Sequence, residues 1–233
     1  MLPTYNTIAS LAWRQYLNRF DVILFSQTVF NLPVLALVWY IKQWFPLPGG
    51  EVVLTAYWPN LPIQLALDYG AGIITSIAVI MIILAMQLAV KRQPINFAYI
   101  FGAALRLYPW VILLSLVELV LTVLGLSLFV LPGLLVTILL SMMVPTYVWY
   151  KLSPWQALVR SIQLVRKNFW SNVFYILLTQ LLITLVIMVT TWGLPTTLWF
   201  NIFSAWVGAI CASFYTVFVT ILMTLNEKQP KQQ

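Results

Sequence analysis

Histidine is absent from this chain of 233 residues, and cysteine occurs only once, at Cys211. Without histidine the chain has no Ser-His-Asp triad, no histidine general base and no histidine-ligated metal or haem. A single cysteine excludes an internal disulfide, a four-cysteine zinc site and a cysteine-ligated cluster. Because no nucleophile lies beside a base, we predict no catalytic residue, no metal site and no cofactor, and we expect a protein that is not an enzyme.

Charge is also scarce. Charged residues make up 7% of the chain and hydrophobic residues 62%, whereas a soluble domain has about 25% charged and about 45–50% apolar residues. A chain with so few charges cannot cover its surface in water. The composition therefore predicts an integral membrane protein that forms one domain over residues 1–233.

Apolar stretches long enough to cross a bilayer as helices occur six times. A spanning helix needs about 20 mostly apolar residues, whereas a spanning β-strand needs only about ten. The predicted spans cover residues 22–41, 69–90, 109–130, 133–150, 169–191 and 202–225. The predicted fold class is therefore all-α, a polytopic membrane protein whose six transmembrane helices form three hairpins.

The basic residues predict the orientation of these spans, because cytoplasmic segments carry an excess of Lys and Arg. With the N-terminus inside, eleven of the twelve basic residues fall in inner segments and only Lys42 falls outside. We expect a multi-pass protein of the cytoplasmic membrane with both termini in the cytoplasm. The first twenty residues lack a compact apolar core and a cleavage site, so we expect the first span to be retained.

A basic amphipathic stretch precedes each predicted hairpin, at residues 8–20, 95–107 and 154–168. In the third stretch the polar residues recur at spacings of four, three and four, which places them on one side of a helix. These residues are Gln156, Arg160, Gln163 and Lys167. We therefore expect three helices that lie in the cytoplasmic interface of the membrane.

The basic residues of these stretches are the predicted contacts with anionic lipids or a membrane partner, because each cation near the surface gains about 1 kcal/mol from anionic head groups. They are Arg14, Arg19, Arg106, Arg160, Arg166 and Lys167. The alternative is that these helices only connect and anchor the spans. We expect no nucleic-acid partner, because the charges are spread over short loops and no soluble domain forms a groove.

Two dipeptides are predicted to have structural roles. Pro132 and Gly133 are expected to form the tight turn between the third and fourth spans. Ser153 can cap the third amphipathic helix, and Pro154 then occupies the first helical position, where proline is tolerated.

Glu118 is the one ionisable residue deep in a predicted span. A charged side chain there costs about 2.5–3.5 kcal/mol on insertion scales, and no predicted span contains a Lys or Arg to pair with it. Two interpretations stay open. Glu118 is either a carboxyl that couples proton or substrate movement, or a neutral side chain that hydrogen-bonds to a neighbour. The candidate neighbours are Asn31, Thr179 and Gln180.

The most specific pattern lies between residues 130 and 183. It begins with Val-Leu-Pro-Gly at 130–133, passes through Pro145 and continues with SPWQALVRS at 153–161 and LVRKNFW at 164–170. This pattern resembles YciC-like small bacterial inner-membrane proteins and the related membrane domain of glycerophosphodiester phosphodiesterases. The resemblance implies a small protein of the bacterial inner membrane. It does not imply phosphodiesterase activity, which belongs to a separate barrel domain that uses histidine and acidic residues.

Two functions therefore remain open. The first is a non-enzymatic membrane protein that contributes to envelope or lipid homeostasis through anionic lipids or a membrane partner. The alternative is a small transporter or permease component that uses Glu118, with Pro33 and Pro145 breaking their spans. A polar cavity that reaches Glu118 would favour the alternative. Small residues at every fourth position of the last span, such as Gly208 and Ala212, allow close packing within the chain or in a homo-oligomer.

Overall fold

Helices are the only regular elements in the part of the chain that the computed structural model describes, residues 2–42, 61–191 and 198–228. They confirm the all-α fold class. In chain order they are α1 (Tyr5–Asn18), α2 (Phe20–Ser26), the π-helix η1 (Gln27–Asn31), α3 (Leu32–Lys42), α4 (Leu61–Val90), α5 (Phe97–Leu128), α6 (Val130–Leu140), α7 (Met143–Tyr150), α8 (Pro154–Lys167), α9 (Phe169–Thr191) and α10 (Leu198–Lys228).

Six helical segments of the described chain are long and apolar enough to cross a membrane, as the sequence predicts. They are Phe20–Val38, Gly70–Val90, Phe97–Thr122, Leu131–Tyr150, Phe169–Thr190 and Ile202–Lys228. The first combines α2, η1 and α3, and the fourth combines α6 and α7. The protein is therefore a multi-pass membrane protein in which two of the six spans are irregular helices.

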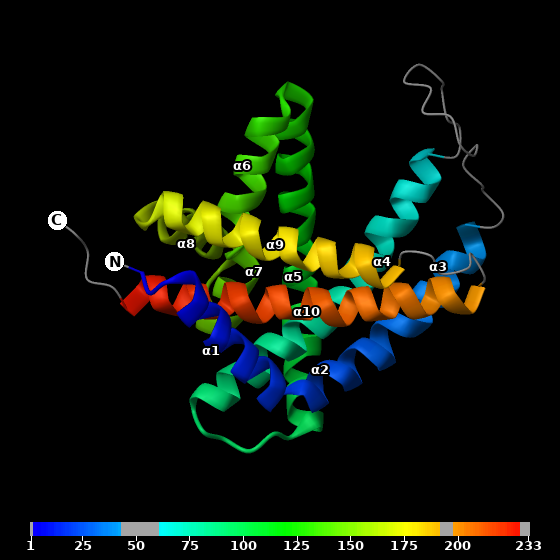
Figure 1. Ribbon diagram of the computed structural model, residues 1–233, viewed down its shortest axis with the longest axis horizontal. Coiled ribbons are helices and arrows are strands. Elements are labelled where there is room, and N and C mark those ends of the chain that lie inside the picture. The colour runs from blue at the N-terminus through cyan, green and yellow to red at the C-terminus, as the bar shows by residue number, and fades with distance from the viewer. Residues whose placement is uncertain (1, 43–60, 192–197, 229–233) are drawn as a thin grey trace.

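The spans cross one another at different angles. In Figure 1, α9 and α10 lie side by side and antiparallel, whereas α5 and α6 form a hairpin at a steep angle to them. The interior helix is α4, where Ile80, Met81 and Ile83 are fully buried. Large apolar side chains point outward elsewhere, such as Phe129 at 76% exposure and Val189 at 69%. Such exposure is consistent with helices that face lipid.

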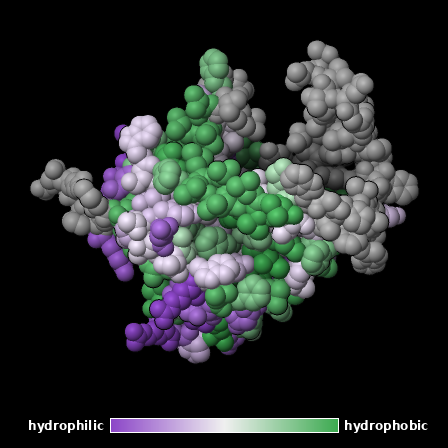
Figure 2. Space-filling model, viewed as in Figure 1, coloured by the Kyte–Doolittle hydropathy of each residue, from purple (hydrophilic) through white to green (hydrophobic). Residues whose placement is uncertain are grey.

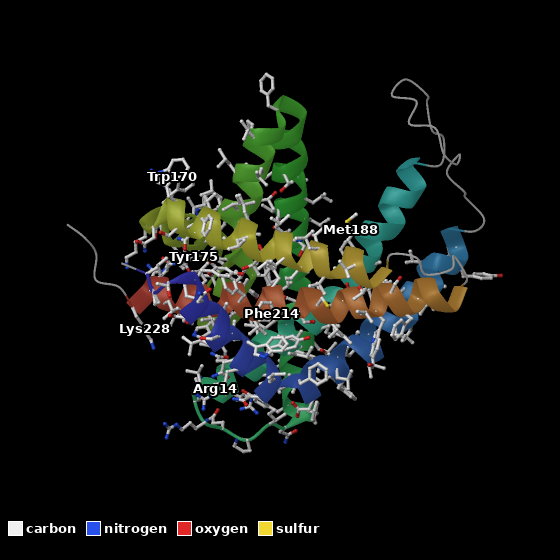
Figure 3. All side chains as sticks on the ribbon, viewed as in Figure 1. Arg14, Trp170, Tyr175, Met188, Phe214 and Lys228 are labelled. Carbon is white, nitrogen blue, oxygen red and sulfur yellow. The ribbon has the colours of Figure 1, made fainter. Side chains whose placement is uncertain are left out.

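Hydrophilic residues gather on one side of the bundle. Figure 2 shows them along the left and lower left, whereas apolar residues cover α6 and α9. Figure 3 places Arg14 and Lys228 on this hydrophilic side. We call this side the basic face and define it by Arg14 and Lys228.

The turn between the third and fourth spans differs from the prediction. Pro132 and Gly133 do not form this turn, because they lie in the first turn of α6. Proline is tolerated there, since the backbone N–H that it lacks would have no partner within the helix. The chain reverses at Phe129 alone, which is extended with φ −163° and ψ 160°. Gly125 permits close packing of α5 on α6 here, since a Cβ on Gly125 would lie 2.8 Å from the Gly133 Cα.

Two of the three predicted amphipathic helices exist as separate elements, α1 and α8. The second prediction is wrong. The stretch around residues 97–107 forms the first turns of α5, which continues through Pro109. Asn96 begins this helix by accepting a hydrogen bond from the Tyr99 amide at 3.1 Å. A proline removes only the hydrogen bond to the Leu105 carbonyl, a loss that membrane helices tolerate.

The predicted cap of α8 is confirmed. The Ser153 hydroxyl accepts from the Gln156 amide at 3.4 Å, and the Gln156 side chain accepts from the Ser153 amide at 3.2 Å. Pro154 is the first residue of the helix. This reciprocal capping box satisfies two backbone donors at the start of α8.

Candidate functional site

The fourth span is broken in its interior. The helix stops at Leu140, turns through Ser141 and Met142, and resumes at Met143. The Ser141 amide bonds to the Ile138 carbonyl at 3.3 Å, a tighter turn than an α-helix makes. Pro145 has no N–H to offer the Ser141 carbonyl, which a continuous helix would require. Non-helical backbone at membrane depth is tolerated where it is buried in protein or lines a cavity.

A cavity of about 410 Å³ lies beside this break, and Glu118 lines it. Helices α4, α5, α6, α7, α9 and α10 all contribute to its wall. The polar side chains around it are those of Glu118, Thr137, Ser141, Gln180, Tyr215 and Thr216. The rest of the wall is apolar, so the cavity presents one carboxyl among hydroxyl, amide and phenol groups.

The three predicted neighbours of Glu118 are placed differently from one another. Gln180 lines the same cavity as Glu118. Thr179 is buried and bonds to the Tyr175 carbonyl at 2.8 Å and to the Tyr5 hydroxyl at 3.2 Å. Asn31 lines a second cavity. The structure thus brings Glu118 together with Gln180 alone of the three.

The second cavity, of about 400 Å³, adjoins the first, because Val79 and Thr216 line both. Its remaining wall consists of η1, α3, α4 and α10. The lining residues include Gln27, Asn31, Gly72, Thr75, Gly208, Ala212 and Ser213. Small residues of α4 and α10 therefore leave space here that larger side chains would fill.

The hydrogen bonds of Ser213 orient the Gln27 amide. The Ser213 hydroxyl donates to the Ala209 carbonyl at 2.9 Å, so its oxygen is free to accept. The Gln27 amide nitrogen donates to that oxygen at 2.6 Å, which leaves Gln27 Oε1 without a partner. Asn31 Oδ1 is also buried without a partner. An unsatisfied buried acceptor is unusual and costs about 1–3 kcal/mol.

The π-helix that presents these amides lies directly before Pro33. In a regular α-helix the proline ring clashes with the Val29 carbonyl and cannot donate to it. The wider turn, in which the Leu32 amide bonds to the Gln27 carbonyl, accommodates this conflict. Gln27 was not among the residues predicted from the sequence. The signal that could have identified it is a pair of amide side chains four positions apart, at Gln27 and Asn31, shortly before Pro33 within a span.

Two of the six predicted lipid-contacting cations are engaged within the protein. Arg160 forms an ion pair with Glu227 at 2.8 Å, and the Tyr150 hydroxyl bonds to the same carboxylate. Lys167 donates to the Asn226 carbonyl at 2.8 Å. These contacts fasten α8 to the end of α10. Among the other four, Arg14, Arg106 and Arg166 are exposed and Arg19 is half-buried.

Asparagines at the end of α10 complete this attachment. Asn226 donates to the Asn172 side chain at 2.9 Å and accepts from Asn168 at 2.9 Å. Asn172 in turn donates to the Val165 carbonyl at 2.9 Å, near the end of α8. Asn172 and Asn226 were not predicted from the sequence, because they bond to each other across more than fifty positions of the chain.

Helix α1 is held by its tyrosines. The Tyr16 hydroxyl donates to the Ile210 carbonyl at 2.9 Å. Burial is the main cause that raises the pKa of Tyr16, so its hydroxyl stays neutral and able to donate. Ile8 and Ala12 are fully buried on the same side. The opposite side exposes Trp13 at 54% and Leu17 at 53%, beside the exposed Arg14. This helix therefore has one side on the bundle and one amphipathic side facing out.

No group of three or more acidic or cysteine side chains that could hold a metal ion occurs in the described ranges. No family model, no curated protein and no solved structure matches this chain. The YciC-like resemblance therefore stays a prediction that rests on residues 130–183.

Proposed function

We propose that the protein is a small transporter, or the membrane component of one, in which Glu118 binds a proton or a small polar solute on its way across the bilayer. The observation that carries this proposal is the cavity at the break in the fourth span, onto which Glu118 opens. The polar side chains that share this cavity with Glu118 support the transport alternative over a role in lipid contact alone.

The cost of burying charge supports this proposal. A carboxylate near the middle of a bilayer costs several kcal/mol, and the cavity lining contains no Lys or Arg that would offset it. Protonation removes that cost. Glu118 can therefore be a charged carboxylate or a neutral carboxylic acid in the same site. Coupling to proton movement requires a group with two such states.

The broken helix supports the proposal as well. Discontinuous helices form the binding sites of many transporters, because their unpaired backbone groups can bind ligands. The turn at Ser141 and Met142 is also a point at which α6 and α7 can change their relative angle. The adjoining cavity at Gln27 and Asn31 extends the polar region further across the bundle.

The test is proton-driven flux in proteoliposomes made from the full chain. Glu118→Gln removes the titratable group with little change in size, and we expect it to abolish flux under an applied pH gradient. The matched control is Asp21→Asn, which removes an exposed carboxylate outside both cavities and should leave flux unchanged. Failure of the wild type to move protons, amino acids, amines or sugars would contradict the proposal.

A second candidate function is contact with anionic lipids or a membrane partner. It is favoured by the exposed side of α1, where Arg14 lies between Trp13 and Leu17, since a basic and aromatic helix face binds the membrane interface. We propose that this face and both termini are cytoplasmic, because cytoplasmic segments carry an excess of Lys and Arg. The YciC-like resemblance supports the inner membrane of a bacterium as the location.

Cysteine labelling tests this orientation. In a Cys211→Ser background, Gln93→Cys lies in the α4–α5 connection and Leu131→Cys beside the α5–α6 turn, and both positions are exposed. We expect a membrane-impermeant maleimide to label only Leu131→Cys in intact spheroplasts. Labelling of Gln93→Cys under the same conditions would reverse the orientation.

A further inference from the structure

A pocket of about 460 Å³ lies between the end of α4, the first three turns of α5 and the end of α7. Three cationic side chains line it, one from each of these helices or its end. They are Lys91, Arg106 and Lys151. Among the described residues, the lining contains no acidic side chain. We propose that this pocket binds a phosphate group, that of an anionic phospholipid.

The convergence of the cations is the first argument. Lys91 and Lys151 lie near the C-terminal ends of α4 and α7, where a cation also offsets the helix dipole. Arg106 has no such role, because it lies in the interior of α5. A dipole effect therefore does not explain all three. A pocket lined by one guanidinium and two ammonium groups offers phosphate oxygens both bidentate and point-charge partners.

The start of α5 adds a second attraction for an anion. Ala98 and Tyr99 line the pocket from the first turn of this helix. The Tyr99 amide donates to the Asn96 side chain, so the attraction comes from the partial positive charge at the N-terminus of the helix and not from a free Tyr99 amide. The α5 helix has 32 residues, so its first turn is firmly part of a long element.

The ends of α4 and α7 are fixed beside the pocket. Arg92 and Lys151 have φ values of 55° and 52°, and each lies just past the end of its helix, where a left-handed residue commonly ends a helix. Gln87 donates to the Trp149 carbonyl at 3.0 Å, which ties the end of α4 to the end of α7. The two helix ends that carry Lys91 and Lys151 are thereby held relative to each other.

The apolar floor favours a lipid over a free anion. Leu84, Leu88 and Leu107 line the pocket below the cations. Gly102 leaves additional space, because nothing lies within 4 Å of a Cβ at that position. A basic rim above an apolar floor, between helices at the membrane surface, matches a headgroup followed by its glycerol and acyl chains. A free phosphate would leave the floor unused.

This site is independent of the proposed transport function, because it shares no lining residue with either interior cavity. The test compares binding by the purified full chain of phosphatidylglycerol, of zwitterionic phosphatidylcholine and of inorganic phosphate, measured by native mass spectrometry and by thermal stabilisation. We expect phosphatidylglycerol to bind and phosphatidylcholine not to bind, with no competition from inorganic phosphate. Competition by millimolar phosphate would show instead a soluble ligand and overturn the lipid assignment.

A triple variant separates the pocket from the other cations of the chain. Lys91→Gln, Arg106→Gln and Lys151→Asn remove the three cations, and asparagine tolerates the positive φ at position 151. We expect phosphatidylglycerol affinity to fall about tenfold or more. The control is Arg92→Asn with Lys228→Gln, which removes two exposed cations that neither line the pocket nor belong to the predicted lipid contacts. A loss of affinity in this control equal to that in the triple variant would overturn the proposal.

A single substitution keeps the test valid if the triple variant is unstable. Arg106→Lys retains the charge at an exposed position but removes the bidentate geometry that a guanidinium offers phosphate. We expect a several-fold loss of phosphatidylglycerol binding with an unchanged melting temperature. Unchanged binding of phosphatidylglycerol in Arg106→Lys together with binding of phosphatidylcholine would overturn the assignment to an anionic phospholipid.

Discussion

The two interior cavities are similar in size and share a wall, yet their chemistry differs. One holds the carboxyl of Glu118 beside a broken α-helix, and the other holds the neutral amides of Gln27 and Asn31 on a π-helix. Each distortion lies just before a proline, Pro145 in one case and Pro33 in the other. The comparison teaches that only the first cavity can change its charge, whereas the second can only accept hydrogen bonds.

The largest expected effect separates these two roles. Loss of a group that transfers protons costs about 100-fold or more, so Glu118→Gln should reduce proton-driven flux at least that far. The double variant Gln27→Leu and Asn31→Leu removes two hydrogen-bond acceptors and should reduce flux about tenfold. Flux assays in proteoliposomes measure both. Equal losses would mean that the two cavities form one functional unit.

The prolines provide the second test. Pro145→Ala restores a donor for the Ser141 carbonyl and should let the fourth span close into a continuous helix. We expect flux to fall about tenfold, because a continuous helix would misplace the groups that line the site. Amide hydrogen exchange at residues 141–146 should also slow. Pro33→Ala should affect the second cavity in the same way but reduce flux less. The control is Pro109→Ala, because α5 is already continuous at that proline. A change in flux for Pro109→Ala equal to that for Pro145→Ala would contradict the special role of the break.

The spans and the α8 cap were predictable because each depends on residues close together in sequence. An apolar run of sufficient length specifies a membrane helix, and Ser153 with Gln156 specifies a cap three positions apart. The merged helix α5 was missed, since a proline within a membrane helix does not by itself end it.

The sites were less predictable, because their geometry depends on contacts between distant residues. Glu118 could be identified from its cost in a span, but its cavity depends on six helices. The role of Gly125 depends on Gly133 across the hairpin, and that of Arg160 on Glu227 in α10. A proline predicts a distortion of its helix, yet the choice between a π-turn at Gln27 and a break at Ser141 follows from the neighbours against which each helix packs.

A smaller effect is expected on stability. Asn31→Leu removes a buried acceptor without a partner, so the free energy of unfolding should rise by about 1 kcal/mol. Thermal unfolding in detergent, followed by tryptophan fluorescence, measures the change. Gln180→Leu in the first cavity is the matched control and should raise stability less, because Gln180 is exposed to its cavity. A loss of stability in Asn31→Leu would show that its amide oxygen has a partner after all.

The smallest effect is expected where polar groups are already paired. Arg160 and Glu227 keep 41% and 32% of their side-chain surface exposed, and such pairs contribute about 0.2–1 kcal/mol. Glu227→Gln should therefore lower the free energy of unfolding by less than about 1 kcal/mol, with a smaller loss at high salt. Flux should not change, because Glu227 lines neither interior cavity. If Glu227→Gln reduced flux as strongly as Glu118→Gln, the attachment of α8 to α10 would belong to the transport mechanism.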